Sequence, residues 1–116
     1  IVPEDDDSLN IFVSRAEAAE HAIEVSTITV DSFAAENSLT VDVIKIDTEG
    51  CEKRVLLGAR ETLRRDHPFI VMAAYHRFED PVLLPEVVRQ LCPDYDIAEM
   101  LSTSQGREPI LRMRVG

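Results

Sequence analysis

The sequence predicts an α/β domain whose sheet is mostly parallel and closes with an antiparallel hairpin. A continuous Val/Ile run at Val41–Asp47 is typical of a strand buried on both faces. A helical pattern follows at Thr48–Arg65, and another apolar run follows at Phe69–Tyr75. A strand, a helix and a strand joined by short connections form a right-handed unit with parallel strands. Two later apolar stretches, Tyr95–Met100 and Ile110–Val115, flank a polar turn and predict the hairpin.

Length and composition indicate a single domain. The 116 residues suffice for one modest hydrophobic core. The net charge of −10 argues against nucleic acid or an anionic membrane as a partner, because clustered Lys and Arg hold both. No apolar run is long enough for a membrane-spanning helix.

The cysteines and histidines show no metal-binding spacing. Cys51 and Cys92 form no CxxC pair, which favours two reduced thiols in an intracellular, cytoplasmic protein and leaves a disulfide open. His21, His67 and His76 show no ligand spacing with either cysteine, so no metal site is expected.

Three elements are expected before the central run. Ser8–Ser14 alternates enough to be a strand, and the β-branched segment Ala22–Val30 predicts another. Asp31 and Ser32 can cap a short helical segment that ends at Asn37.

These elements divide the domain into two parts. Residues 1–40 should hold the N-terminal strands and a loop, and residues 41–116 the strand–helix–strand unit, a further helix and the closing hairpin. The chain begins at Ile1 without a methionine, so we expect a fragment of a longer protein.

Two helices are expected to cover the sheet. The first, Thr48–Arg65, has Glu52 among the residues that face water. Its apolar stripe consists of Val55, Leu56, Ala59 and Leu63. The second begins at Asp80, has Pro85 in its first turn and stops at Pro93. Its buried side should hold Val87, Val88 and Leu91.

Charged groups follow the two parallel strands. Ligands of open α/β sheets bind at the carboxyl ends of the strands, where Asp47 and Glu49 follow the first strand and His76 the second. If these strands are neighbours, Asp47 and His76 lie on the same rim. His76 is the best general-base candidate because its ordinary pKa is nearest neutrality, although a histidine after a strand more often hydrogen-bonds a loop. The helix dipole is sufficient to explain Glu52.

Lys45 lies inside the first strand, on the face that also carries Val43 and Asp47. It would point toward a covering layer, where an unpaired ammonium is costly. Two interpretations stay open. One is a structural ion pair with a nearby carboxylate; the other is a role in steering a substrate hydroxyl or positioning a catalytic carboxylate.

The central residues resemble a family signature. Ile44–Glu52 (IKIDTEGCE) and Val55–Ala59 (VLLGA) are similar to the I-K-I-D-x-E-G-x-E strand and V-L-x-G-A helix of the FkbM-type S-adenosylmethionine-dependent methyltransferases. Thr27–Phe33 resembles the T-x-L-D segment of that family, with Val in place of the usual Leu. Pro68–Val71 and the pair Tyr75-His76 resemble its next strand and the end of that strand. The resemblance is good over about residues 25–76 and loose elsewhere.

The resemblance implies a class I methyltransferase fold, a Rossmann-like sheet of which this chain would form the C-terminal part. It implies S-adenosylmethionine as cofactor and a hydroxyl of a small molecule or sugar as the methyl acceptor. It places His76 as base, Asp47 near the acceptor or the cofactor sulfonium, and Lys45 and Glu49 as orienting partners. The catalytic candidates are therefore His76, Asp47 and Lys45, and the cofactor-binding candidates are Asp47 and Glu49.

The same resemblance implies that the main cofactor-binding elements precede this chain. The glycine-rich loop and the acidic residue that hold the cofactor in that fold would lie before Ile1. The isolated chain is therefore expected to be inactive and to bind S-adenosylmethionine poorly.

Two other functions stay open. The chain could be a non-catalytic α/β interaction domain derived from the same fold, or a metal-dependent enzyme that uses Asp47, Glu49 and Asp80 as oxygen ligands. A truncated sheet would also expose an apolar strand edge, so we expect the chain to form homo-oligomers.

Overall fold

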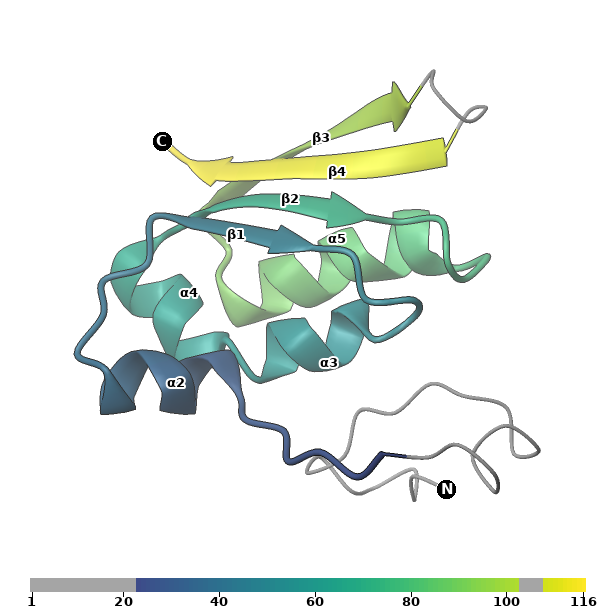
Figure 1. The fold of residues 1–116 in the computed structure, drawn as a ribbon. Coiled ribbons are helices and arrows are strands. Elements are labelled where there is room, and N and C mark those ends of the chain that lie inside the picture. The colour runs from purple at the N-terminus through teal and green to yellow at the C-terminus, as the bar shows by residue number, and fades with distance from the viewer. Residues whose placement is uncertain (1–22, 103–107) are drawn as a thin grey trace.

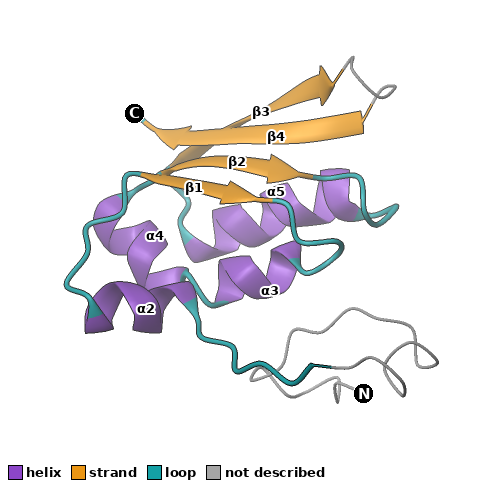
Figure 2. Cartoon of the chain, viewed as in Figure 1, coloured by secondary structure: helices purple, strands orange, loops and turns teal. Residues whose placement is uncertain are grey.

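The computed structural model describes residues 23–102 and 108–116, so the expected strand at Ser8–Ser14 lies outside the described residues. The elements are α2 (Val30–Glu36), β1 (Val43–Ile46), α3 (Glu52–Leu57), α4 (Arg60–Asp66), β2 (Phe69–Ala73), α5 (Asp80–Leu91), β3 (Tyr95–Ser102) and β4 (Glu108–Val115). They form two layers, with the labelled helices on one side of the sheet (Figures 1 and 2). None of these helices is long and apolar enough to cross a membrane.

The four described strands lie in the order β1-β2-β4-β3. β1 and β2 are parallel, with Lys45 opposite Val71, which confirms the predicted strand–helix–strand unit. β3 and β4 pair antiparallel and confirm the hairpin. The expectation of a mostly parallel sheet is wrong for these strands. Because β4 lies between β2 and β3 and is antiparallel to both, β1–β2 is the one parallel pairing among them.

The hydrophobic core lies between the sheet and the helices. The strands contribute side chains that are almost fully buried, namely Ile46, Ile70, Met72, Leu111 and Met113. The helices contribute Leu56, Leu63, Leu84, Val87, Val88 and Leu91, and the connection between α3 and α4 contributes Ala59. The predicted buried side of α5 is therefore confirmed. Removal of these apolar surfaces from water is the main favourable contribution to joining the two layers.

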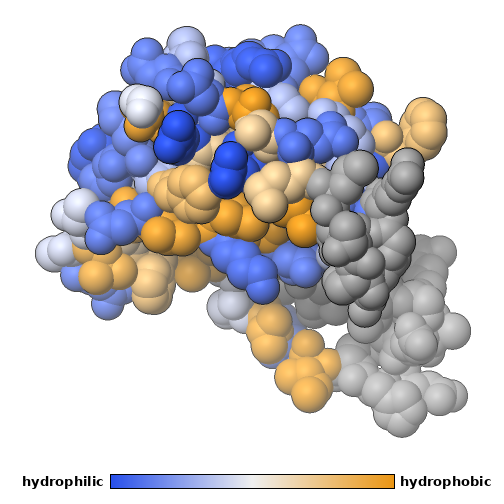
Figure 3. All heavy atoms as spheres, turned by 90° about the horizontal axis from the view of Figure 1, so that it is seen from above, coloured by the Kyte–Doolittle hydropathy of each residue, from blue (hydrophilic) through white to orange (hydrophobic). Residues whose placement is uncertain are grey.

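The other face of the sheet has no described helix on it. In β1, Val43 is 62% exposed and Lys45 is exposed, so the prediction that this strand is buried on both faces is wrong. Apolar atoms run through the middle of this side of the molecule, between hydrophilic margins (Figure 3). β1 also has β2 as its single neighbour in the described sheet, so it is an edge strand.

The strand predicted at Ala22–Val30 is wrong for the described part of that segment. Residues 23–29 form no regular element, and Ile23 is 78% exposed. The Oγ1 atom of Thr29 accepts a hydrogen bond from the backbone N–H of Ser32 and begins α2. β-branched residues favour a strand when they pack on a sheet neighbour, and this segment has no neighbour in the described sheet. The predicted short helix is confirmed, with a different cap residue.

The helix predicted at Thr48–Arg65 is two helices, broken at Gly58. The Asp31 carboxylate accepts hydrogen bonds from the backbone N–H groups of Glu61 (3.0 Å) and Thr62 (2.8 Å), and so caps the start of α4. The Asp31 backbone N–H donates to the Gly58 carbonyl at 2.9 Å. A Cβ at Gly58 would lie 3.1 Å from the Cβ of Thr29, so this glycine allows α2 to pack closely. A cap from a distant residue thus interrupts a continuous helical pattern.

Helix α5 begins at Asp80 and ends at Leu91, before Pro93, as predicted. Pro85 lies inside the helix and is buried, so its predicted place in the first turn is wrong. Pro81 occupies that first turn, where its missing N–H costs no helical hydrogen bond.

Candidate active site

The parallel pairing of β1 and β2 brings their carboxyl ends to one edge of the sheet. Ile46, the last residue of β1, lies opposite Met72, which is next to the last residue of β2. The loops that follow therefore carry Asp47 and His76 to the same rim, as predicted, and the two loops can be followed beside each other in Figure 1.

His76 and Glu52 form the closest contact of this rim. The Nδ1 atom of His76 lies 2.8 Å from Oε1 of Glu52, the first residue of α3. The same oxygen accepts a hydrogen bond from the backbone N–H of Thr48 at 2.9 Å. Glu52 is 1% exposed and the His76 side chain 11%, so the contact is largely shielded from water. A carboxylate on Nδ1 fixes the orientation of the ring and leaves Nε2 for chemistry.

The Nε2 atom of His76 faces two further carboxylates. It lies 3.4 Å from Oδ1 of Asp47 and 3.3 Å from Oε1 of Glu49. The Asp47 side chain is 43% exposed and that of Glu49 is 79% exposed, so this side of the ring is open to solvent. A neutral imidazole that donates from Nδ1 presents an acceptor at Nε2. Nε2 of His76, Oδ1 of Asp47 and Oε1 of Glu49 are then three acceptors around one point. Such a point suits a hydroxyl or a positively charged group of a ligand.

Glu52 is held in its charged form. Burial opposes ionisation, but the hydrogen bond from the Thr48 backbone and the nearby His76 outweigh it and lower the pKa of Glu52. Its second oxygen, Oε2, and the hydroxyl of Thr48 are buried without a hydrogen-bond partner among residues 23–102 and 108–116.

A tight turn places Glu49. Glu49 has a φ of 54° and Gly50 a φ of 101°, and glycine adopts such a backbone at least cost. The Arg77 Nε–H donates to the Gly50 carbonyl at 3.1 Å and connects this turn with the loop after β2. The sequence pattern gave no sign of this contact.

Asp80 is not directed at the Asp47–Glu49 pair. Its Oδ2 accepts a hydrogen bond from the Arg77 backbone N–H at 3.0 Å. Burial raises the pKa of Asp80, against that hydrogen bond, and the charge of Glu52 raises it further. The described group whose ligand atoms could meet at one cation on this rim is instead Asp47, Glu52 and His76, within 4.8 Å of one another.

Two neighbours of the rim, Tyr75 and Cys51, have raised pKa values. Burial and the charges of Asp47, Glu108 and Glu49 raise the pKa of Tyr75, whose ring centroid lies 4.5 Å from that of His76. Burial also raises the pKa of Cys51, which precedes α3 and forms no disulfide. Cys51 is therefore a buried thiol.

Lys45 does not join the cluster. It is exposed on the uncovered face of the sheet and forms no hydrogen bond or ion pair with another residue in the described ranges. The expectation that its ammonium is buried is wrong, because the helices cover the opposite face of β1.

Glu52 was expected to face water, and this prediction is also wrong. Glu52 precedes Val55 and Leu56 by three and four residues, so helical spacing places it on the buried stripe. That spacing is the signal in the sequence that could have identified it.

Comparisons with known proteins identify the family of the chain. The family model of the methyltransferase FkbM domain matches residues 2–106. The crystal structure of methyltransferase FkbM from Methylobacillus flagellatus KT is similar, with a TM-score of 0.68 and 27% sequence identity. The similarity covers 77% of this chain and 23% of that chain. Comparison with curated proteins found no match. The chain belongs to the FkbM methyltransferase family.

Proposed function

We propose that this chain forms the acceptor side of an S-adenosylmethionine-dependent methyltransferase that methylates a hydroxyl oxygen on a small molecule or sugar. The observation that carries the proposal is the position of His76. Its Nδ1 contacts the buried Glu52, and its Nε2 faces the open rim beside Asp47 and Glu49. Family membership supports the methyl-transfer part of the proposal.

In this proposal His76 is the base. A substrate hydroxyl that donates to Nε2 can give up its proton there as the oxygen becomes bonded to carbon. Glu52 keeps the ring in the orientation and tautomer that presents Nε2, and it stabilises the imidazolium that forms. Lys45 is left out of this machinery because it points to the other side of the sheet and does not contact the cluster.

The rim suits the charge of the cofactor. S-adenosylmethionine carries positive charge on its sulfonium and on its amino group, and Asp47 and Glu49 offer carboxylates on the open side of His76. These two residues would hold the positive groups. When bound, the cofactor supplies a methyl group on a positively charged sulfur.

We infer that the 116 residues alone bind S-adenosylmethionine weakly. The chain spans 23% of the similar crystallised methyltransferase. Asp47 and Glu49 are partly or largely exposed, so water and salt screen their attraction for a cation. Tight stoichiometric binding of S-adenosylmethionine to this chain in a calorimeter would contradict the inference.

Methyl transfer from labelled S-adenosylmethionine to hydroxyl-bearing small molecules tests the proposed chemistry. The protein for this assay is the one produced from the complete coding sequence of the chain. His76→Gln and Asp47→Asn should each lower turnover by at least about a hundredfold, since a positioned base alone contributes about 10²–10⁴-fold. Near-normal turnover of His76→Gln would show that His76 is not the base.

The second candidate is a non-catalytic interaction domain of the same fold. The observation in its favour is the partly apolar face that no described helix covers, beside the edge of β1 that no described strand pairs with. The assay above separates the two functions. A complete protein that neither binds the cofactor nor transfers methyl groups would favour the interaction domain.

A further inference from the structure

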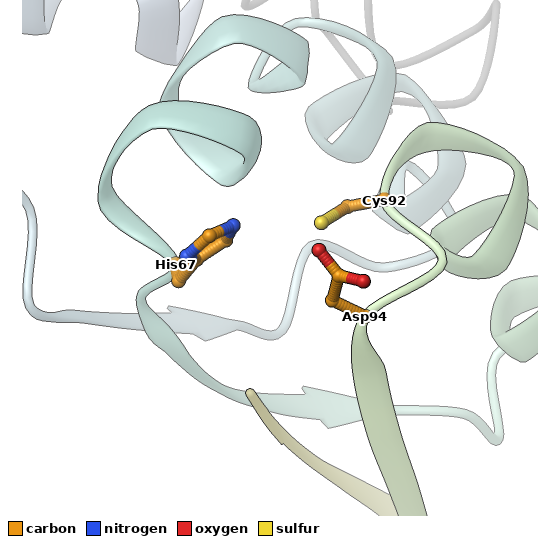
Figure 4. Close-up of side chains that lie close together, drawn as sticks. All are labelled: His67, Cys92 and Asp94. Carbon is orange, nitrogen blue, oxygen red and sulfur yellow. The ribbon is translucent and has the colours of Figure 1, made fainter. Parts of the chain in front are cut away.

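A second group of reactive side chains lies at the other end of β2. His67 precedes this strand, whereas His76 follows it, and Cys92 and Asp94 lie in the connection between α5 and β3. A ring nitrogen, the sulfur and a carboxylate oxygen of the three residues lie within 4.8 Å of one another. Figure 4 shows the side chains pointing toward a common space. We call His67, Cys92 and Asp94 the thiol cluster.

Two hydrogen bonds hold the segments that carry the thiol cluster. On one side, the Arg64 Nε–H donates to the Leu91 carbonyl at 2.8 Å. On the other side, the Tyr95 hydroxyl donates to the buried Pro68 carbonyl at 2.7 Å. Each bond joins the segment around His67 to the segment that carries Cys92 and Asp94. The three ligand-bearing residues therefore sit between two fixed points, which lowers the entropy cost of bringing them to one ion.

The backbone at the cluster favours a cation. His67 and Cys92 are the C-terminal caps of α4 and α5, where the helix dipoles concentrate partial negative charge. His67 has φ 49° and ψ 50°, a left-handed conformation that glycine usually provides at helix ends. A histidine occupies this position here, and its ring points toward Cys92.

We propose that the thiol cluster binds a divalent transition-metal ion of the zinc type. A thiolate, an imidazole and a carboxylate are ligands that zinc accepts, and water can complete a tetrahedral set from the exposed side. The thiolate and the carboxylate together neutralise a divalent charge. Cys92 is 3% exposed, whereas His67 and Asp94 are exposed, so these two side chains are free to close the remaining distance onto the ion.

This site would be structural. It ties the α4–β2 connection to the α5–β3 connection, at the opposite end of β2 from the proposed catalytic rim. The absence of regular ligand spacing in the sequence does not exclude it, because folding brings His67 and Cys92 together from separate helix ends.

Cobalt substitution of the metal-free, reduced 116-residue chain tests the proposal. Titration with Co²⁺ should produce a thiolate-to-cobalt charge-transfer band in the near ultraviolet and the intense visible bands of a tetrahedral site. One equivalent of Zn²⁺ should remove both. Cys92→Ser should abolish the charge-transfer band. His67→Asn, which tolerates the left-handed backbone, and Asp94→Asn should each weaken Co²⁺ binding by at least about tenfold.

Matched variants decide between this site and other metal-binding groups. Cys51→Ser removes the other thiol and Asp96→Asn removes an exposed carboxylate of β3, and both should keep the band. A band that survives Cys92→Ser, or Co²⁺ that binds without a thiolate band, would contradict the proposal. Circular dichroism establishes that each variant is folded. If Cys92→Ser does not fold, the His67→Asn variant decides the question. Equal Co²⁺ affinity of His67→Asn and the unaltered chain would then contradict the proposal.

Discussion

Oε1 of Glu52 lies 2.8 Å from Nδ1 of His76 and receives the Thr48 backbone N–H at 2.9 Å. This buried carboxylate joins the first turn of α3 to the loop after β2. It serves stability and orientation at once, because the same charge fixes the turn after β1 and the imidazole ring. The stability of the turn after β1 and the orientation of the His76 ring should therefore depend on Glu52 more than on any exposed carboxylate.

Glu52→Gln should destabilise the chain at neutral pH by about 1–3 kcal/mol, since a charged acceptor of two partly buried hydrogen-bond partners is replaced by a neutral one. The pKa of Glu52 is lowered from 4.5 in the folded chain, so its charge contributes stability above pH 4.5. That contribution is lost as the pH falls through the lower, folded pKa. Urea unfolding at several pH values measures this effect. The difference in the free energy of unfolding between Glu52→Gln and the unaltered chain should become smaller as the pH falls below 4.5. The control is Glu86→Gln on the exposed side of α5, which should show no such change.

Asp80→Asn should have the opposite pH dependence. Burial raises the pKa of Asp80 above 3.8, so ionisation of this carboxyl in the folded chain costs stability. The cost is absent below pH 3.8 and develops as the pH rises through the folded pKa. Asparagine keeps an oxygen for the Arg77 N–H and carries no charge. Urea unfolding measures the stability of Asp80→Asn relative to the unaltered chain. This relative stability should be higher at pH 7 than at pH 3, and a higher value at pH 3 would contradict the assigned cost of burial.

Asp31→Ala should destabilise the chain by about 1–2 kcal/mol, as expected for loss of an N-terminal cap. The Asp31 carboxylate accepts three hydrogen bonds at the start of α4, from the Glu61 N–H, the Thr62 N–H and the Thr62 hydroxyl. Chemical unfolding measures the effect. Asp42→Ala, an exposed aspartate beside β1, is the matched control and should change the free energy of unfolding by less than about 0.5 kcal/mol. Equal effects of the two variants would show that Asp31 does not define the break between α3 and α4.

The 116-residue chain should self-associate through the edge of β1 that has no partner strand among residues 23–102 and 108–116. Edge strands with unpaired backbone groups template pairing with another chain, and a lysine on the edge opposes it. Val43→Lys, at a position that is 62% exposed on β1, should reduce the apparent mass in light scattering at high concentration. Val82→Lys, at a 75% exposed position on α5, should leave it unchanged. A monomeric unaltered chain at high concentration would contradict the prediction.

The sequence predicts those parts of the fold that rest on local pattern. The Val/Ile run of β1, the apolar stretch of β2 and the helix that ends before Pro93 lie where periodicity places them. Features set by distant residues escape such reasoning. The break at Gly58 depends on Asp31, and the antiparallel majority depends on where β4 inserts. Neither has a local signal.

The candidate site was predictable in part for the same reason. Placing Asp47 and His76 on one rim needs only the parallel pairing of two strands, which local pattern supports. The roles of Lys45 and Glu52 depend on which faces the helices cover. A strand of continuous apolar residues does not specify its covered face, so Lys45 was expected to be buried and is exposed. Glu52 was expected to be exposed and is buried, although its helical spacing to Val55 and Leu56 indicates the buried side.

We propose the rim of Asp47, Glu49 and His76 as the methyl-transfer site. Calorimetric titration with S-adenosylmethionine of the protein produced from the complete coding sequence tests this assignment. Asp47→Asn should weaken the affinity by at least about tenfold, whereas Asp42→Asn, before the opposite end of β1, should leave it unchanged. Equal affinities of Asp47→Asn, Asp42→Asn and the unaltered protein would contradict the assignment of this rim.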